Sequence, residues 1–426
     1  MQKLQKVTLF ETPKEFGIFL VFLAFVFMLS LSFEYHRYKQ LTQNKTATVE
    51  ARVLKSYLKT KNKRTYRVLK LQLFPLHTFY TTTSKKFYIP QGSIAKLKLY
   101  TTHLGFLDFL RGFFAKSWFY NYKAPPSFTD HIAKKLHTLH KNSQIYAIYA
   151  ALFLAQPLPY ELSTFFSSLG ISHLFALSGF HIAFLTTILF FVYALIYTPF
   201  HKRFFPYRDK KRDIFILTAL SIFIYMYTIN IPPSLLRAFG MMIVGFYLYS
   251  RGFELFNFQT LFITILLLLA VFPPLFFSLG FWLSVLGVFY ILLFLQLYPN
   301  LTLIQQFFLI PVWVYLMMLP TSLYIFGNFS VYHPISVGIS YLFGLFYPLS
   351  LFVHLIGCGS LFDPLVEKLL HVEITTKIFH PAFGFWLFFL LLGFITLFQK
   401  KLAYLLVALS CIFFSYYFYK LIAVLV

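Results

Sequence analysis

The stretch HLFALSGFHIAFL, residues 173–185, places His173, Ser178 and His181 within one of the most apolar parts of the chain. Polar side chains are costly there unless they form hydrogen bonds or face water. Three kinds of chemistry could retain them: nucleophilic catalysis by Ser178 with His181 as the base, a metal site between the histidines, or a polar lining for a passage. The fourth interpretation is structural, with Ser178 and Gly179 permitting close helix packing while the histidines bond to backbone carbonyls.

Catalysis and metal binding both lack residues that they need. A serine nucleophile requires a base within hydrogen-bond reach, a group that orients that base, and an oxyanion site. Ala176 occupies the position at which a Gly-x-Ser-Gly signature has glycine, and no acidic residue stands nearby. The same apolar stretch offers no carboxylate and no His-Glu-x-x-His pattern for a metal. Cys358 and Cys411 form no metal-binding array. The sequence therefore predicts no catalytic residue, no metal and no cofactor.

A buried charge favours the polar lining. Arg237, in PPSLLRAFGMM, lies about one helical turn inside an apolar stretch that starts at Pro232. A guanidinium at that depth must be paired, snorkelled or hydrated. Ionisable residues in membranes usually face a bundle interior or a water-filled cavity and mark a transport route. Three weaker candidates stand near the ends of apolar stretches: Glu161, His333 and Asp363.

The composition requires a membrane around these residues. The 426 residues are 59% hydrophobic and only 12% charged, more apolar surface than a soluble fold of this size can bury. A first apolar stretch covers residues 16–33, and it continues as LSFEYHRYK without a cleavage site, which is typical of a retained anchor. Nine further stretches approach the length of a membrane-spanning helix: 172–197, 214–230, 233–249, 257–271, 275–297, 303–325, 335–357, 380–397 and 402–425. The fold class expected is a polytopic α-helical membrane protein with about ten transmembrane helices.

The net charge of +24 is concentrated between residues 34 and 142, where 21 lysines and arginines face four acidic residues. Alternation in ATVEARVLKSY and IAKLKLY predicts strands, and KTKNKRT has the chemistry of a hairpin turn. Residues 34–104 are therefore expected to form an inserted small all-β, OB-like domain that binds single strands or anionic lipid, unless its basic surface is merely solvated. The basic residues expected to contact DNA are Lys59, Lys61, Lys63, Arg64, Lys96 and Lys98, and the tyrosines that could stack on bases are Tyr57, Tyr66, Tyr80 and Tyr88.

The segment after this domain has a different pattern. Residues 105–120, GFLDFLRGFFAKSWFY, combine aromatic bulk with Arg111 and Lys116. This is typical of an amphipathic helix at a membrane interface, or of a helix packed on the barrel. The domain division expected is 1–15 cytoplasmic, 16–33 anchor, 34–104 external domain, 105–142 interfacial helical segment and 143–426 multi-span domain.

Charge in the loops predicts the orientation. The loop HKRFFPYRDKKRD, residues 201–213, carries six lysines and arginines, and short basic loops stay in the cytoplasm. Counting back through one span puts the β-domain outside and the N-terminus inside, which agrees with Lys3, Lys6 and Lys14. We expect a multi-pass protein of the cytoplasmic (inner) membrane whose β-domain lies on the outer, periplasmic side.

Several of these segments also resemble one family. GISHLFALSGFHIAFL is similar to the core motif of the ComEC family of competence channels, and IPPSLLRAFGMM resembles its Pro-Ser-x-x-Arg-Ala element. FFSLGFWLSVLGV, residues 276–288, is similar to a third element with Gly-Phe-x-Leu-Ser. LGFLDFLRGFF resembles the segment that follows the family's external OB domain. Carried over by position, the channel-motif residues are His173, Ser178, Gly179, His181, Pro233, Ser234, Arg237, Ala238, Gly280 and Ser284.

The resemblance implies passage of single-stranded DNA through the inner membrane during natural transformation. It implies a periplasmic DNA-delivery protein as a partner and leaves room for a homo-oligomer. The chain has no GxxxxGK[ST] loop, so the driving force is expected from a cytoplasmic ATP-driven translocase. It also has no HxHxDH motif, so no nuclease activity is expected. The alternatives are an intramembrane hydrolase that uses Ser178 and His181, and a membrane protein that handles lipid or another polymer.

Overall fold

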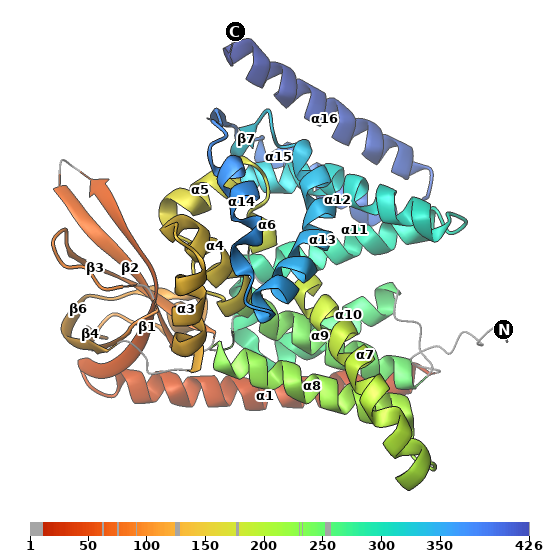
Figure 1. Cartoon of the computed structure of the whole chain (residues 1–426), viewed down its shortest axis with the longest axis horizontal. Coiled ribbons are helices and arrows are strands. Elements are labelled where there is room, and N and C mark those ends of the chain that lie inside the picture. Colours follow the sequence, from red (N-terminus) through yellow and green to blue (C-terminus); the bar gives the residue numbers. More distant parts are fainter. Residues whose placement is uncertain are drawn as a thin grey trace. The chain divides into compact units, whose positions relative to one another are not determined.

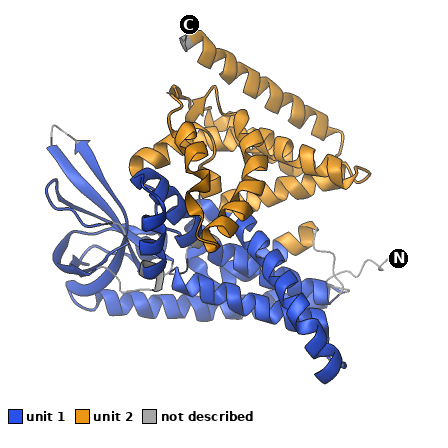
Figure 2. Ribbon diagram, in the orientation of Figure 1, with its two compact units in different colours: residues 1–158, 176–255, 262–281 blue, residues 159–175, 256–261, 282–426 orange. Residues whose placement is uncertain are grey.

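The computed structural model describes residues 12–61, 64–74, 76–90, 92–123, 128–175, 179–229, 231, 233–251 and 257–425 (Figure 1). The chain divides into two compact units, which Figure 2 shows in different colours. Unit 1 contains residues 1–158, 176–255 and 262–281, and unit 2 contains residues 159–175, 256–261 and 282–426. Two of the predicted site residues, Lys63 and Ser178, lie outside the described residues.

Six helices among the described residues are long and apolar enough to cross a membrane. They are Pro13–Thr42 (α1), Gly179–Phe204 (α7), Leu279–Leu297 (α11), Leu303–Phe326 (α12), Ile335–Leu355 (α13) and Leu402–Ala423 within α16. Four shorter apolar helices cover Ser143–Leu154, Leu235–Ser250, Phe258–Val271 and Phe383–Ile395. Helix α8 (Lys210–Thr228) is in neither group, and its first turn holds four charged residues. The structure thus supports a multi-span protein with six helices of spanning length among the described residues, and it does not confirm the predicted count of about ten.

The basic segment of unit 1 folds as a six-stranded sheet with the order β5-β3-β2-β1-β4-β6. The strands are Thr46–Lys61 (β1), Arg64–Phe74 (β2), His77–Ser84 (β3), Ile94–Tyr100 (β4), Phe113–Phe114 (β5) and Ser117–Lys123 (β6). The predicted alternation is present in β4, where Ala95, Leu97 and Leu99 are fully buried and Lys96 is exposed. In Figure 1 the hairpin of β1 and β2 extends beyond the other strands.

Strands β5 and β6 connect the two edges of this sheet. Phe113 and Phe114 pair in parallel with β3, and after Ala115 and Lys116 the chain pairs antiparallel with β4. The hydroxyls of Thr81 and Ser117 lie 2.7 Å apart across the same junction. Strands β3 and β4, the outer strands of the order β3-β2-β1-β4, are therefore linked through one continuous segment.

The expected helix over residues 105–120 is wrong in its second half. Helix α2 covers only Phe106–Arg111, because Gly112 adopts a φ of +96°, in the region that favours glycine. Phe113 and Ala115 are then buried while Lys116 is exposed, which is the alternation of a strand. The aromatic residues that suggested an interfacial helix instead supply β-propensity to β5 and β6.

The helices of unit 1 pack through a separate apolar cluster. Helix α4 (Ser143–Leu154) is buried along most of its length, and the Tyr225 hydroxyl of α8 donates to the Phe153 carbonyl at 2.8 Å. Helices α7, α8 and α9 (Pro233–Ser250) meet around Ile182, Ile222 and Leu235. A contact of 3.1 Å from the Thr186 hydroxyl to Met242 Sδ joins α7 to α9. Helix α10 (Phe258–Val271) and the short helix η1 (Pro273–Phe277) follow.

The expected span over residues 172–197 is described only in part, because residues 176–178 lie outside the described residues. Helix α6 (Ser172–Phe175) precedes this gap, and α7 begins at Gly179 after it. His173 therefore belongs to α6 in unit 2, whereas His181 belongs to α7 in unit 1.

Unit 2 holds most of the C-terminal helices. Its remaining elements are Tyr160–Ser168 (α5), Asn328–Ser330 (β7), Gly359–Phe362 (η2), Asp363–Leu370 (α14), Thr376–Ile378 (β8), Phe383–Ile395 (α15) and Leu402–Leu425 (α16). Strands β7 and β8 pair antiparallel. Helices α11, α12, α15 and α16 share a core around Tyr290, Met317 and Leu406, where Trp313 donates to the Tyr290 carbonyl at 2.9 Å.

Candidate functional site

Three motif segments, distant in sequence, meet in unit 1. A Cβ placed on Gly179 of α7 would lie 4.0 Å from the Ala238 Cβ of α9, so these helices approach closely at this point. A Cβ placed on Gly280, at the start of α11, would lie 3.6 Å from Nη1 of Arg237. The structure therefore brings together Gly179, Arg237, Ala238 and Gly280, which the sequence selected separately. We call these four residues the motif junction.

Arg237 is the only one of these four that carries a charge, and its side chain is half-buried. None of the described residues forms an ion pair or a hydrogen bond with it. A partly desolvated guanidinium retains five donors that water or an anion must satisfy. The motif junction therefore holds an anion-binding group within an apolar helical unit.

His181 lies two residues after Gly179 on α7, about half a helical turn away, and is 1% exposed. Its ring stands at right angles to that of Phe180, with the centroids 5.9 Å apart. This histidine is packed within unit 1.

The segment before Gly280 is held by the β-domain. Phe277 packs against the core of the β-domain, and the Arg111 guanidinium of α2 lies 5.4 Å from the centroid of its ring. The N–H of Phe281 donates to the Ser278 hydroxyl at 3.3 Å, and Phe281 is fully buried. The β-domain core thus positions the first turn of α11, which faces Arg237.

The other motif residues do not join the junction among the described residues. His173 is exposed on α6, and Ser284 lies on the part of α11 that belongs to unit 2. Pro233 and Ser234 begin α9, but their side chains are not described. Within the described part of the chain, no group of three His, Cys, Asp or Glu residues could hold a metal ion.

His333, a weaker sequence candidate, is buried in unit 2. Its Nδ1 would lie 2.9 Å from a Cβ on Gly170, whose φ of +75° suits glycine. The Ser330 hydroxyl donates to the Ser168 carbonyl at 2.5 Å, and Asn328 donates to the Ser167 hydroxyl at 3.2 Å. Burial lowers the pKa of His333 to about 4, so the imidazole is neutral at physiological pH. This cluster fixes α5 to β7.

The basic residues predicted for DNA contact occupy two places in the β-domain. Lys59 and Arg64 are exposed near the tip of the β1–β2 hairpin, where Lys61 pairs with Arg64. Lys96 and Lys98 lie on the outward face of β4. The sequence therefore selected two separate basic surfaces.

Sequence reasoning missed a third basic feature. Lys55 of β1 stands directly opposite Lys70 of β2, and like charges so placed destabilise a sheet. Partial desolvation and then the charge of Lys70 lower the pKa of Lys55, and burial lowers that of Lys70. The Lys70 ammonium lies 5.5 Å from the ring centroid of Tyr80, one of the predicted stacking residues. Only the register between β1 and β2 reveals this pair, and an anion would relieve its repulsion.

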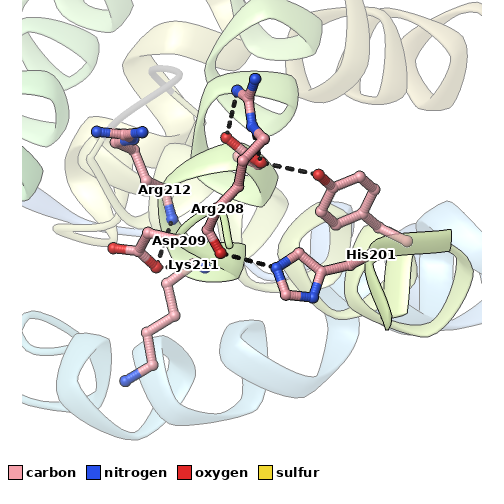
Figure 3. Close-up of polar contacts among 7 residues, drawn as sticks. His201, Arg208, Asp209, Lys211 and Arg212 are labelled. Carbon is pink, nitrogen blue, oxygen red and sulfur yellow. Dashed lines mark hydrogen bonds and ion pairs between the residues drawn. The ribbon is translucent and has the colours of Figure 1, made fainter. Parts of the chain in front are cut away.

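The loop between α7 and α8 is tightly organised (Figure 3). Arg208 forms two hydrogen bonds of 2.8 Å with the Asp213 carboxylate, to which the Tyr197 hydroxyl also donates at 2.8 Å. Nε2 of His201 donates to the Arg208 carbonyl at 2.8 Å. The Asp209 carboxylate caps α8 by accepting from the N–H groups of Lys211 and Arg212. Arg208 and Asp213 therefore have a structural role.

These features define a class of protein, namely a multi-pass membrane protein that carries a basic β-domain. A family model described as Competence protein matches residues 155–426. The chain belongs to this competence family, the ComEC-like proteins, and the family indicates a role in DNA uptake during competence. Comparisons with curated proteins and with solved structures gave no match.

Proposed function

We propose that this protein conducts single-stranded DNA through the cytoplasmic membrane during natural transformation. The observation that carries the proposal is Arg237, a half-buried cation at the motif junction with no anionic partner among the described residues. Phosphates cannot cross hydrocarbon without a wet and partly cationic path, and ionisable residues of this kind mark such paths. Arg237 would contact the phosphates as they pass, while Gly179, Ala238 and Gly280 leave room beside it.

The β-domain would receive the strand on the outer side of the membrane, with the N-terminus in the cytoplasm. Its strand order supports an OB-like barrel, because the meander β1–β3 pairs with β4 through β1 and with β5 through β3. In such barrels the face of the second and third strands and the loop before them bind oligonucleotides. Here those positions carry Lys70 and Tyr80, with Lys59 and Arg64 in the hairpin.

Transport also needs partners that this chain does not supply. A periplasmic protein would deliver DNA to the β-domain, and a cytoplasmic ATP-driven translocase would pull the strand. The organised loop of residues 201–213 carries six lysines and arginines and would face that translocase. Further copies of the chain could complete the conduit as a homo-oligomer.

Substitution of Arg237 tests the proposal in a transformation assay that separates DNA arrival outside the cell from entry into the cytoplasm. Arg237→Lys should retain part of the entry step, because the charge persists, whereas Arg237→Met should lose nearly all of it. DNA arrival and the amount of protein in the membrane should not change. Arg251→Met is the matched control, because this exposed arginine follows the same helix and lies over Tyr247. Equal entry in the Arg237→Met variant and in the wild type would exclude Arg237 from the path.

A further inference from the structure

An exposed aromatic and basic surface covers one side of the β-domain. It consists of outward-facing side chains of β4 and β6, which we call the β4–β6 face: Lys96, Lys98, Tyr100, Trp118 and Tyr120. The orientation follows from burial, because Ala95, Leu97 and Leu99 are fully buried and alternate with these positions of β4. Phe119, opposite Leu97, packs against the core of the domain, so Trp118 points outward.

The aromatic rings of this face are strongly exposed. Trp118 is 67% exposed, Tyr120 is 55% exposed and Tyr100 is 50% exposed. Tryptophan side chains are, on average, largely buried in folded proteins. Clustered exposed aromatic residues mark an interaction site, whereas single ones need no explanation.

The lysines lie beside these rings in a fixed register. Lys98 of β4 pairs directly with Trp118 of β6, and a bulge between Lys96 and Leu97 adds Tyr120 to the strand as an extra residue. Glu50 of β1 stands opposite Lys96 on the other side and offsets part of its charge. Lys98 is therefore the principal cation next to the indole ring.

We propose that the β4–β6 face is a stacking platform for the unpaired bases of single-stranded DNA, with Lys98 binding the adjacent phosphate. The proposal rests on the proposed function and adds a surface separate from the hairpin and the β2–β3 face. Base–aromatic stacking tolerates any sequence, because every base has a flat π-face. A duplex presents its bases already stacked, so these rings select single strands.

A lipid headgroup is the competing ligand for a surface made of tryptophan, tyrosine and lysine side chains. The anchor α1 argues against it. Its apolar stretch ends at Phe33, and the helix continues for nine more residues to Thr42, a rise of about 13 Å. Tyr100 of the β4–β6 face pairs with Thr46 of β1, four residues after the end of α1. We therefore assign this face to nucleic acid.

The experiment uses the full chain in nanodiscs containing phosphatidylglycerol. A labelled oligodeoxythymidine strand and a duplex of equal length are titrated against wild type, Trp118→Ala, Trp118→Phe, Tyr120→Ala and Tyr404→Ala. Trp118→Ala should weaken single-strand binding about tenfold, since stacking on one ring contributes enough for such a change. Trp118→Phe should retain most of the affinity. Tyr404, which is 75% exposed on α16, is the matched control for Tyr120 and should have no effect.

Tryptophan fluorescence provides a second readout that folding alone does not change. The signal of Trp118, obtained as the difference between wild type and Trp118→Phe, should be quenched by the single strand and much less by the duplex. Equal loss of single-strand and duplex binding in Trp118→Ala would overturn the proposal, as would an unchanged single-strand affinity. Quenching of Trp118 by brominated phosphatidylglycerol in the absence of DNA would assign the face to lipid and also overturn it.

The outcome is separable from that of the proposed function. If Trp118→Ala binds single strands normally while Arg237→Met still blocks DNA entry, the stacking platform is rejected and the proposed DNA conduit is retained. If the platform binds single strands but a strain without the protein still takes up DNA, the conduit fails and the platform stands.

Discussion

At the scale of single residues, Arg208 and Arg237 carry the same charge in opposite surroundings. Arg208 is held by two hydrogen bonds to Asp213 at the end of a loop. Arg237 lies half-buried within a helix and has no such partner among the described residues. A paired arginine stabilises its own loop, whereas one without a carboxylate can bind a mobile anion. Pairing in the structure, and not residue type, separates the two roles.

Replacing Asp213 by Asn should loosen the loop. Hydrogen bonds from Arg208, and then from Tyr197, lower the pKa of Asp213 to about 2. Its carboxylate therefore stabilises the folded loop above the ordinary pKa of about 3.9 and loses this effect as the pH falls towards 2. We expect Asp213→Asn to increase tryptic cleavage within residues 202–212 several-fold at neutral pH.

Asp209→Asn is the matched control for that experiment, because it removes the same charge but keeps an oxygen that caps α8. Its cleavage rate should remain close to that of the wild type. Similar acceleration in both variants would mean that net charge, and not the Arg208–Asp213 contact, holds the loop.

At the scale of elements, η1 links the β-domain to the motif junction. Phe277 of η1 packs on the β-domain core, and Gly280 lies beside Arg237 three residues later. Strand binding in the β-domain and the cation in the helical unit are thus joined by one short segment.

Truncation of Phe277 should uncouple these two parts. Loss of this partly buried ring should weaken the attachment of η1 by about 1–3 kcal/mol, less than for a fully buried phenylalanine. We expect Phe277→Ala to bind single-stranded DNA within about twofold of the wild type, and to reduce DNA entry several-fold. Hydrogen exchange over residues 273–281 measures the loosening. The neighbouring Phe276 is 56% exposed, and equal effects from Phe276→Ala would contradict the coupling.

The β1–β2 hairpin should contribute charge without stacking. Each phosphate contact on a single strand changes the log–log salt slope of binding by about −0.7. Replacing Lys61, Lys63 and Arg64 by Gln should therefore flatten the slope by about two units. The same change at the exposed pair Lys400 and Lys401 is the control. An unchanged slope in the hairpin variant would indicate that the hairpin contacts lipid headgroups and not DNA.

At the scale of the whole molecule, orientation in the membrane decides which surface meets DNA first. Single cysteines report it when Cys358 and Cys411, both exposed and free, are replaced by Ser. An impermeant maleimide added to intact spheroplasts should label Lys59→Cys but not Tyr207→Cys, whose position is 82% exposed in the loop. Both should react after lysis. The opposite labelling would invert the topology and move the β-domain to the exit side.

The sequence by itself determined the membrane class, the basic β-domain and the identity of the motif residues. Apolar length and strand alternation are local properties, and they located α8 to α13 within a few residues. The basic charge of residues 34–142 is likewise visible without a fold. These features can be predicted from the sequence because hydrophobic burial and β-propensity act over short stretches of chain.

Only the tertiary structure decided which residues meet. It assigned His173 and His181 to different compact units, and it turned the aromatic segment after Gly112 into strands. It also set Lys55 opposite Lys70, and Arg237 beside Gly280. The physical reason is that sheet register and helix contact depend on packing between segments far apart in the chain. The local sequence pattern shows which residues are polar, but it does not show which other residues they contact in the fold.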